Sequence, residues 1–497
     1  MSLISVNDLT FCYDGSYDNI FEHASFELDT DWRLGFVGRN GRGKTTFLNL
    51  LLGKYEYKGT IRASVRFTYF PFPVADERRD TLDVLSEVTE GAPEWMLLRE
   101  LGRMGMDAEI LYRPFVTLSP GEHTRALLAA LFLRENNFLL IDEPTNHLDA
   151  EGRALLRDYL RAKKGFILVS HDRAFLDGCV DHILSINRAN ITVTRGNFST
   201  WWENKARQDA YELAENERLM GDIRRLKSAA QQSSAWADRV EATKIGNAID
   251  SADKMKNTRS YVAAQSAKMQ QRRKNLERRQ QNAIEEKSKL LRNIERNDAL
   301  LIHPLSHRKE VVAEVRELAV RYGEVPVFDG LSFEVRQGMR LALTGHNGSG
   351  KSSVVKLLAG ELIPHTGLVR LPGDLIVSYV PQDTSFLKGD LTEFARRSGI
   401  DESLFKTILR KLDFPRVQFE KDMADFSAGQ RKKVLLARSL SEQAHLYLWD
   451  EPLNYVDVLS RMQIEALLST GNPTMVFVEH DAAFLDAVAT DRIRIGG

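Results

Sequence analysis

The sequence predicts an α/β protein with two similar domains in tandem, joined by a helical-hairpin linker. A glycine-rich pattern, G-x-x-x-x-G-K-[ST], occurs at residues 38–45 and again at residues 345–352. In each half the pattern follows a short apolar strand, as expected of a parallel sheet with a loop at its carboxyl edge. The stretch between the halves has helical flanks. We therefore predict domains at residues 1–200 and 308–497 and a linker at residues 201–307.

The composition narrows the class of protein. With 497 residues, the chain is too long for one ordinary core. Its net charge of -1 gives no overall signature of nucleic-acid binding, and we expect no DNA contact. Cys12 and Cys179 fit neither a disulfide framework nor a metal motif, so we expect a cytoplasmic protein. The longest apolar run, residues 126–133, is far shorter than the ~20 residues that cross a bilayer, so we expect no membrane contact.

The first half begins with two predicted antiparallel strands, Leu3–Phe11 and Ile20–Leu28. A further strand at residues 34–37 leads into the first glycine-rich loop, and a helix is expected from about Thr45 to Gly53. Such a loop folds its N–H groups around phosphate, its lysine reaches the outer phosphates and its Thr or Ser binds Mg²⁺. A glycine-rich turn without a ligand is the alternative.

A helical region is predicted at about residues 81–113. Its expected buried positions are Leu85, Val88, Trp95, Leu98 and Leu101. A second helix is expected to start after Ser119 and to run through Arg134, with Ser119 as its N-cap. On its own, the sequence Leu118-Ser119-Pro120-Gly121-Glu122 indicates no more than a capped helix.

Acidic side chains and a histidine follow two apolar strands. The strand at residues 138–141 ends in Asp142 and Glu143, and the strand at residues 166–169 leads to His171. Open α/β sheets bind ligands at this edge, and paired carboxylates there suit a cation and an attacking water. We assign Asp142 to Mg²⁺ and Glu143 to the water. Considered alone, His171 fits a structural role better than a catalytic one.

A repeat resolves these ambiguities. Lys44 and Lys351 are 307 positions apart, Ser119 and Ser427 are 308 apart, Glu143 and Glu451 are 308 apart, and His171 and His480 are 309 apart. Four pairs of chemically matching residues at nearly equal spacing are not expected by chance. The chain therefore carries two copies of one cassette.

With these motifs the chain resembles the ATP-binding cassette (ABC) family over both cassettes, which implies two ABC-type P-loop nucleotide-binding domains that bind ATP and Mg²⁺ and hydrolyse ATP. The resemblance implies catalytic roles for Glu143, Glu451, His171 and His480, and Mg²⁺ binding by Thr45, Asp142, Ser352, Gln382 and Asp450. It implies nucleotide binding by Tyr13, Gly38, Asn40, Gly41, Gly43, Lys44, Thr45, Thr46, Ser119, Gly121, Tyr322, Gly345, Asn347, Gly348, Gly350, Lys351, Ser352, Ser353, Ser427 and Gly429.

The family's cassettes close head to tail, each ATP lying between one P-loop and the other cassette's Ser-x-Gly signature. Site one would join Lys44 to Ser427, and site two would join Lys351 to Ser119. Asp149 and Asp457 would cross between the cassettes. A single chain can make both sites, so we expect a monomer with intramolecular closure.

Paired cassettes and a charged helical linker resemble the ABC-F class, and the phrases SHDRAFLD, ELAENERL, SAGQRKK and WDEPLNYVD are similar to its antibiotic-resistance branch, especially the Lsa type. This resemblance implies a partner, the bacterial 70S ribosome with its 23S rRNA and peptidyl-site tRNA. The ATP-closed form would occupy the tRNA exit site and protect the peptidyl transferase centre from lincosamide, pleuromutilin and streptogramin A drugs. A housekeeping factor for stalled ribosomes and the ATPase of a membrane transporter are the alternatives.

Three departures from the family predict unequal sites. Phe72 stands where the second cassette has Gln382, whose amide touches Mg²⁺ and water in the family. Pro120 replaces the usual second signature residue, and Leu453 and Tyr455 replace a Thr and a His. Site one should be the slower site.

The linker is predicted to be an antiparallel coiled coil with a non-helical tip near residues 233–267. Its first flank, Trp201 to about Ser228, is rich in Glu, Arg, Leu and Ala, and about 28 helical residues would extend roughly 40 Å. Residues 221–300 hold 18 Lys and Arg against 10 Asp and Glu, which favours a tip that docks into RNA over a solvated loop.

Overall fold

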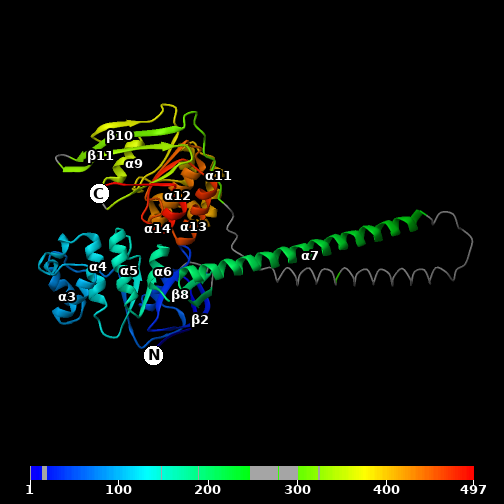
Figure 1. The fold of residues 1–497 in the computed structure, drawn as a ribbon. Coiled ribbons are helices and arrows are strands. Elements are labelled where there is room, and N and C mark those ends of the chain that lie inside the picture. Colours follow the sequence, from blue (N-terminus) through cyan, green and yellow to red (C-terminus); the bar gives the residue numbers. More distant parts are fainter. Residues whose placement is uncertain are drawn as a thin grey trace, which may run out of the picture. The chain divides into compact units, whose positions relative to one another are not determined.

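The computed structural model describes residues 2–13, 19–146, 148–187, 190–246, 278, 300–322, 325–346 and 348–496. The chain divides into two units, one holding residues 1–201 with 297–497 and the other holding residues 202–296. The first unit contains both cassettes, coloured from blue to cyan and from yellow to red in Figure 1.

The first cassette combines a parallel sheet, an antiparallel sheet and a group of short helices. Its elements are β1 (Leu3–Phe11), β2 (Phe21–Asp29), β3 (Arg33–Val37), α1 (Lys44–Leu51), β4 (Lys58–Arg62), β5 (Arg66–Phe70), α2 (Thr81–Val88), α3 (Glu94–Arg103), η1 (Ala108–Tyr112), η2 (Phe115–Thr117), α4 (Pro120–Leu131), β6 (Asn137–Asp142), α5 (Ala150–Arg161), β7 (Phe166–Val169), α6 (Arg173–Cys179), β8 (His182–Asn187) and β9 (Asn190–Arg195).

The second cassette repeats this order. Its elements are β10 (Val311–Tyr322), β11 (Val325–Arg336), β12 (Arg340–Thr344), α9 (Lys351–Leu358), β13 (His365–Arg370), β14 (Val377–Val380), α10 (Leu391–Arg397), α11 (Glu402–Lys411), η3 (Arg416–Glu420), η4 (Met423–Asp425), α12 (Ala428–Ser441), β15 (Leu446–Asp450), α13 (Val458–Gly471), β16 (Met475–Val478), α14 (Ala482–Val488) and β17 (Asp491–Arg494).

The strand orders confirm the predicted α/β class. The larger sheets run β5-β6-β7-β3-β8-β9 and β14-β15-β16-β12-β17, and the antiparallel sheets run β2-β1-β4 and β11-β10-β13. The strand before each P-loop, β3 or β12, pairs in parallel on both sides. Each P-loop therefore leaves the middle of its sheet at the carboxyl edge, where doubly wound sheets bind ligands.

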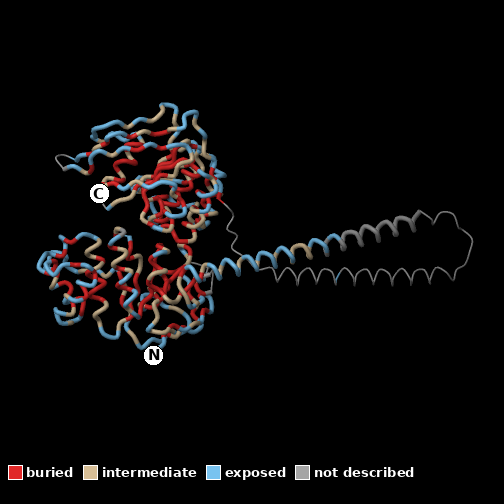
Figure 2. Tube along the Cα trace, in the orientation of Figure 1, coloured by how far each residue is buried: buried red, intermediate tan, exposed pale blue. Residues whose placement is uncertain are grey.

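The core of the first cassette lies between its two sheets. Phe36 of β3 and Phe47 of α1 are fully buried, with ring centroids 5.6 Å apart and nearly perpendicular rings. Figure 2 shows buried residues, in red, gathered inside each cassette. Burying such rings removes apolar surface from water at ~25 cal/mol per Å², which fixes α1 and hence the P-loop on the sheet.

One predicted core residue lies at the surface. Trp95 is 57% exposed and Arg99 stacks on its ring at 5.4 Å, whereas Leu97 and Leu101 are buried. Leu97 and Leu101 lie one turn apart on the face of α3 that packs on α4, and Trp95, two residues before Leu97, lies on another face. The helix was predicted correctly, but its buried face was misjudged at Trp95.

The linker's first helix is longer than predicted. Helix α7 runs from Phe198 to Gly246, 49 residues, and so continues past Ser228 into the stretch at 233–246 that was expected to be a non-helical tip. At 1.5 Å per residue it is about 73 Å long. The heptad pattern fails there, but Ala, Glu, Lys and Arg still favour a helix, because packing and helix formation are separate requirements. The remainder of the tip, residues 247–267, and nearly all of the return flank lie outside the described residues.

No helix among the described residues is long and apolar enough to cross a membrane.

From the packing of the antiparallel sheet in the second cassette, we predict that one glycine, Gly367, does not tolerate substitution. Gly367 has φ +95° and packs so closely on a bulge of β10 that a Cβ would clash with the carbonyl of Glu317. Gly360 also has a positive φ, +88°, but open space around it. We expect Gly367→Ala to cost about 2 kcal/mol more than Gly360→Ala and to lower the thermal unfolding midpoint by roughly 4–8 °C relative to that control. Equal midpoints measured by calorimetry would contradict this packing.

Candidate nucleotide sites

Both P-loops have the same local geometry. Gly43 and Gly350 precede helices α1 and α9 with φ of 95° and 91°, left-handed values that favour glycine. The Lys44 ammonium donates to two loop carbonyls at 2.6 and 3.2 Å, and Lys351 does the same at 2.9 and 2.8 Å. Both lysines are buried. Each loop therefore presents a cation and a helix N-terminus to one point, as phosphate binding requires. Asn347, predicted here, lies outside the described residues.

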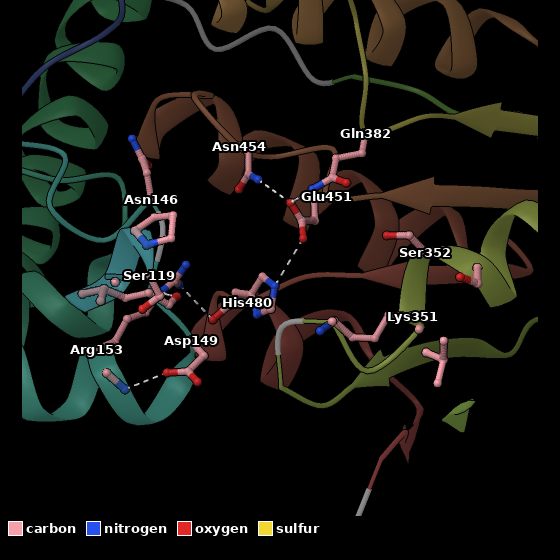
Figure 3. Close-up of a pocket in the computed structure, with 18 of the residues that line it drawn as sticks. Ser119, Asn146, Asp149, Arg153, Lys351, Ser352, Gln382, Glu451, Asn454 and His480 are labelled. Carbon is pink, nitrogen blue, oxygen red and sulfur yellow. Dashed lines mark hydrogen bonds and ion pairs between the residues drawn. The ribbon is translucent and has the colours of Figure 1, made fainter. Parts of the chain in front are cut away.

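A cavity of about 720 Å³ lies at the P-loop of the second cassette. Residues from both cassettes line it, and Figure 3 shows Ser119, Asn146, Asp149 and Arg153 facing Lys351, Glu451 and His480. The lining residues are Ser119, Pro120, Gly121, Arg125, Asn146, Leu148, Asp149, Gly152, Arg153, Tyr322, Val327, Gly348, Gly350, Lys351, Ser352, Ser353, Gln382, Glu451, Asn454 and His480. This is the site predicted to pair Lys351 with Ser119.

A cavity of about 360 Å³ lies at the other P-loop. Its lining again comes from both cassettes: Asn40, Gly41, Lys44, Thr45, Asp142, Glu143, Val169, His171, Asp413, Phe414, Pro415, Ser427, Ala428, Gly429, Gln430, Lys433 and Tyr455. The structure thus brings Lys44 together with Ser427 in one cavity. Both predicted head-to-tail pairings are present in the structure.

The two signature serines cap the helices that approach the opposite P-loops. Ser119 accepts a hydrogen bond from the Glu122 N–H at 3.3 Å, and Ser427 accepts one from the Gln430 N–H at 3.3 Å. Each forms a complete capping box. The cap fixes where α4 and α12 begin, and the positive ends of their dipoles lie beside the cavities.

The glutamates predicted to be catalytic sit in an unusual backbone conformation. Glu143 and Glu451 have φ of 50° and 47°, in the left-handed region that non-glycine residues rarely enter. Their N–H groups bond to the carbonyls of Val169 and Val478 on the neighbouring strands, at 2.9 and 3.1 Å. Non-glycine residues held in such conformations cluster at functional sites. Both glutamates share this backbone conformation, and both line the cavities.

In site two a polar network surrounds the Glu451 carboxylate. It accepts hydrogen bonds from Gln382 at 2.6 Å and from Asn454 at 2.7 Å, and His480 Nε2 lies 3.4 Å from its other oxygen. Figure 3 shows these three side chains converging on Glu451. Burial raises the pKa of Glu451, but the contacts with His480 and Gln382 outweigh it and lower the pKa overall. The network favours a charged, oriented carboxylate.

Site one has a sparser environment. His171 Nε2 lies 3.3 Å from Glu143 Oε1, but this buried oxygen has no hydrogen-bond partner among the described residues. Burial, reinforced by the charge of Asp142, raises the pKa of Glu143 to about 8. Phe72, which replaces the glutamine, packs beneath the Arg134 guanidinium at 5.0 Å and is not part of the cavity lining. The two glutamates thus have different surroundings, and the missing amide at Phe72 is one of the differences.

The metal candidates supply oxygen atoms. Ser352 Oγ donates to Asp450 Oδ1 at 3.1 Å, and Asp450 Oδ2 is buried without a hydrogen-bond partner in the described structure. In site one, Thr45 and Tyr69 both hydrogen-bond to Asp142. Burial raises the pKa of both aspartates, that of Asp450 to about 6. Hydroxyl and carboxylate oxygens, with the Gln382 amide nearby, fit Mg²⁺, which compensates such desolvation.

The two tyrosines predicted to bind nucleotide, Tyr13 and Tyr322, lie in different surroundings. Each hydroxyl bonds to the residue two positions after its P-loop lysine, Tyr13 to Thr46 at 2.8 Å and Tyr322 to Ser353 at 3.0 Å. Tyr322 lines the site-two cavity, whereas Tyr13 packs edge-on against Tyr55 and lies outside the lining of site one.

Direct contacts join the cassettes around site one. Asn40 donates to the Tyr455 carbonyl at 2.8 Å, and Asp413 forms ion pairs with Arg39 and Arg42 at 3.7 and 3.5 Å. On α6 and α13, Arg173 pairs with Glu465 across the interface. These contacts hold the second cassette on the first P-loop.

The two aspartates expected to cross between cassettes are helix caps. Asp149 caps α5 and Asp457 caps α13. Burial lowers the pKa of both P-loop lysines, and the charge of the opposite aspartate offsets part of that shift. Asp457 is fully buried and receives a hydrogen bond from Lys433 at 2.9 Å. Their influence across the interface is electrostatic.

Sequence reasoning missed several residues of the cavity linings, among them Asn146, Asn454 and Arg153. Asn146 and Asn454 follow the glutamates by three positions and are 308 apart, so the repeat itself could have revealed them. Arg153 is likewise 308 positions from Arg461, so the repeat marks the residue, but nothing in the sequence marks its bond to His480.

Comparison with known proteins also identifies two nucleotide-binding domains of one family. The model of the ABC transporter family matches residues 21–146 and 328–454. The chain is 29% identical to the ATP-binding protein Uup of Caulobacter vibrioides over 96% of its own length and 75% of the relative's. It is 24% identical to the ribosome protection protein VmlR of Bacillus subtilis, over 97% and 85% of the two lengths. The energy-dependent translational throttle protein EttA of Haemophilus influenzae is 27% identical, over 96% and 89%.

The fold also occurs in solved structures. The archaeal ribosome recycling factor aABCE1, in complex with a ribosomal stalk protein, superposes with a TM-score of 0.63 at 20% identity, over 99% of this chain and 87% of that one. The relatives above support the ABC-F class within the family. With two matched nucleotide-binding domains and cavities built from both, the chain belongs to the ABC transporter family of ATP-binding cassette proteins and is an ATPase with two composite sites.

Proposed function

We propose that this chain is an ABC-F ATPase that binds the bacterial 70S ribosome at the tRNA exit site when ATP closes its cassettes. Relatives that match nearly all of its length carry the names ribosome protection protein and translational throttle protein. The ribosome is in the cytoplasm, so the protein acts there. The 23S rRNA and the peptidyl-site tRNA are the proposed contacts.

The linker is the observation that carries this proposal. Helix α7 is 49 residues long and, on the described part of its surface, largely exposed. Residues 198–246 hold as many Lys and Arg as Asp and Glu, eight of each, whereas residues 247–300 hold 13 basic against seven acidic residues. The positive charge is thus placed beyond α7, as expected of a segment that meets an RNA backbone.

The finer proposal is protection of the peptidyl transferase centre from lincosamide, pleuromutilin and streptogramin A drugs. The likeness to VmlR favours it. The likeness to EttA, of similar identity, favours a housekeeping factor that acts on stalled ribosomes instead. The ATPase of a membrane transporter is the third candidate and would require a membrane subunit as its partner.

Within each site we propose the following roles. Lys44 and Lys351 hold the outer phosphates, and the Ser119 and Ser427 helices contact them from the opposite cassette. Mg²⁺ would bind Thr45 and Asp142 in site one, and Ser352, Asp450 and Gln382 in site two, where it would neutralise phosphate charge. Glu143 and Glu451 orient water for attack on the γ-phosphate, giving ADP and phosphate, and His171 and His480 contact that phosphate.

The two sites should turn over at different rates. Glu451→Gln leaves site one active, and Glu143→Gln leaves site two active. Phe72 cannot supply the amide that Gln382 gives Glu451. We therefore expect single-turnover hydrolysis to be about 5- to 10-fold slower in Glu451→Gln than in Glu143→Gln. Adding Phe72→Gln to Glu451→Gln should recover part of the rate. Equal rates in the two single variants would count against unequal sites.

Closure by ATP should control ribosome binding. The double variant Glu143→Gln/Glu451→Gln should co-sediment with 70S ribosomes in ATP and much less in ADP, because γ-phosphate bridges the cassettes. Adding Lys44→Ala and Lys351→Ala, which removes the phosphate contacts, provides the matched control. Equal and low recovery in ATP and ADP would refute the ribosome proposal.

Drug protection should depend on the linker. In a sensitive bacterium, the wild type should raise the inhibitory concentration of at least one of the three drug classes. Deletion of residues 233–264 should abolish this effect while co-sedimentation persists, because the cassettes remain intact. Unchanged susceptibility to every drug, with ribosome binding retained, would favour the housekeeping factor.

A further inference from the structure

We propose that Arg153 is a positioning residue that acts across the cassette interface on the hydrolytic machinery of site two. Arg153 lies in the first turns of α5, four residues after the cap Asp149, in the first cassette. Its side chain is 15% exposed and lines the cavity of the opposite P-loop. This inference depends on the ATPase activity and not on the ribosome.

The guanidinium of Arg153 is held by three acceptors. Its Nε donates to the Leu148 carbonyl at 3.1 Å, and its Nη1 donates to Asp172 Oδ2 at 3.3 Å and to the backbone carbonyl of His480 at 3.1 Å. Asp172 directly follows His171 of site one. One side chain therefore touches the histidine loops of both nucleotide sites.

The contact with His480 leads directly to the catalytic centre. His480 Nε2 lies 3.4 Å from Glu451, and Glu451 also binds Gln382 and Asn454. Figure 3 shows the chain of interactions from Arg153 through His480 to Glu451. A planar guanidinium with several fixed donors holds a backbone carbonyl with more directional constraint than a lysine could. Arg153 thus fixes the backbone from which the His480 ring extends.

The counterpart in the second cassette is Arg461, and the structure describes both arginines. Arg461 donates to the Val456 carbonyl at 2.9 Å and to Asp481 Oδ2 at 3.3 Å, matching the first two contacts of Arg153. Of the two, Arg153 makes the bond to the opposite histidine loop. Arg461 is therefore a matched control, buried and paired in the same way but without that bond.

The test measures site two alone. In the Glu143→Gln background, Arg153→Ala should lower kcat about 10-fold while the KM for ATP changes less than about 2-fold, because the lost bond positions His480 and does not bind ATP. Arg153→Lys should recover part of kcat. The control is measured at site one: in the Glu451→Gln background, Arg461→Ala should leave kcat within about 3-fold, because no hydrogen bond from Arg461 reaches the His171 loop in the described structure. A rise in KM at constant kcat, or equal losses in Arg153→Ala and Arg461→Ala, would overturn the proposal.

A double-mutant cycle separates positioning from a general loss of stability. If Arg153 acts through His480, then in Glu143→Gln/His480→Ala the further change Arg153→Ala should alter kcat less than about 2-fold. Multiplicative losses would show that Arg153 acts by another route. If Arg153→Ala lowers the thermal midpoint, the cycle is made with Arg153→Lys instead. If Arg153→Lys then lowers kcat by the same factor with and without His480→Ala, the proposal is overturned.

Discussion

The nucleotide cavities depend on a shared lining, because neither cassette surrounds a phosphate chain alone. In site two the Lys351 ammonium comes from one half and the capped helix at Ser119 from the other, and site one repeats this with Lys44 and Ser427. The lysine and the N-terminus of the capped helix both present positive charge to the cavity, an arrangement that suits an anion lying between them. Under the proposed function, this arrangement couples closure to the charge of the bound nucleotide, and loss of the γ-phosphate weakens it.

The duplication kept the backbone and varied the side chains. Glu143 and Glu451, the glutamates predicted to be catalytic, have the same left-handed φ and the same bond to the next strand. Beside them, Thr145 and Ser170 approach through their hydroxyls at 3.4 Å in the first cassette, whereas Glu479 accepts from the Leu453 N–H at 2.8 Å in the second. Each loop is thus tied by a different bond. Backbone geometry sets what the sites have in common, and local substitutions set their difference.

Local patterns and the repeat predicted most of the fold. Capping serines, strand periodicity and the glycine-rich loops were confirmed because they depend on neighbours in sequence. The predicted burial of Trp95 and the predicted end of α7 were wrong. The buried face of a helix and the point where it ends both depend on packing against residues distant in the sequence. The pairing of Lys351 with Ser119 was found through family geometry, but the bond from Arg153 required coordinates, since backbone carbonyls leave no signal in a sequence.

The ends of the linker are fixed in different cassettes. At its start, Phe198 and Trp201 are buried, and the Ser199 N–H donates to Asp177 of the first cassette at 2.8 Å. At its return, Leu300 and Ile302 join the hydrophobic core of the second cassette. Any movement of one cassette against the other must therefore move one end of the linker relative to its other end. Because packed cores resist deformation, that displacement passes into the linker and not into the anchors.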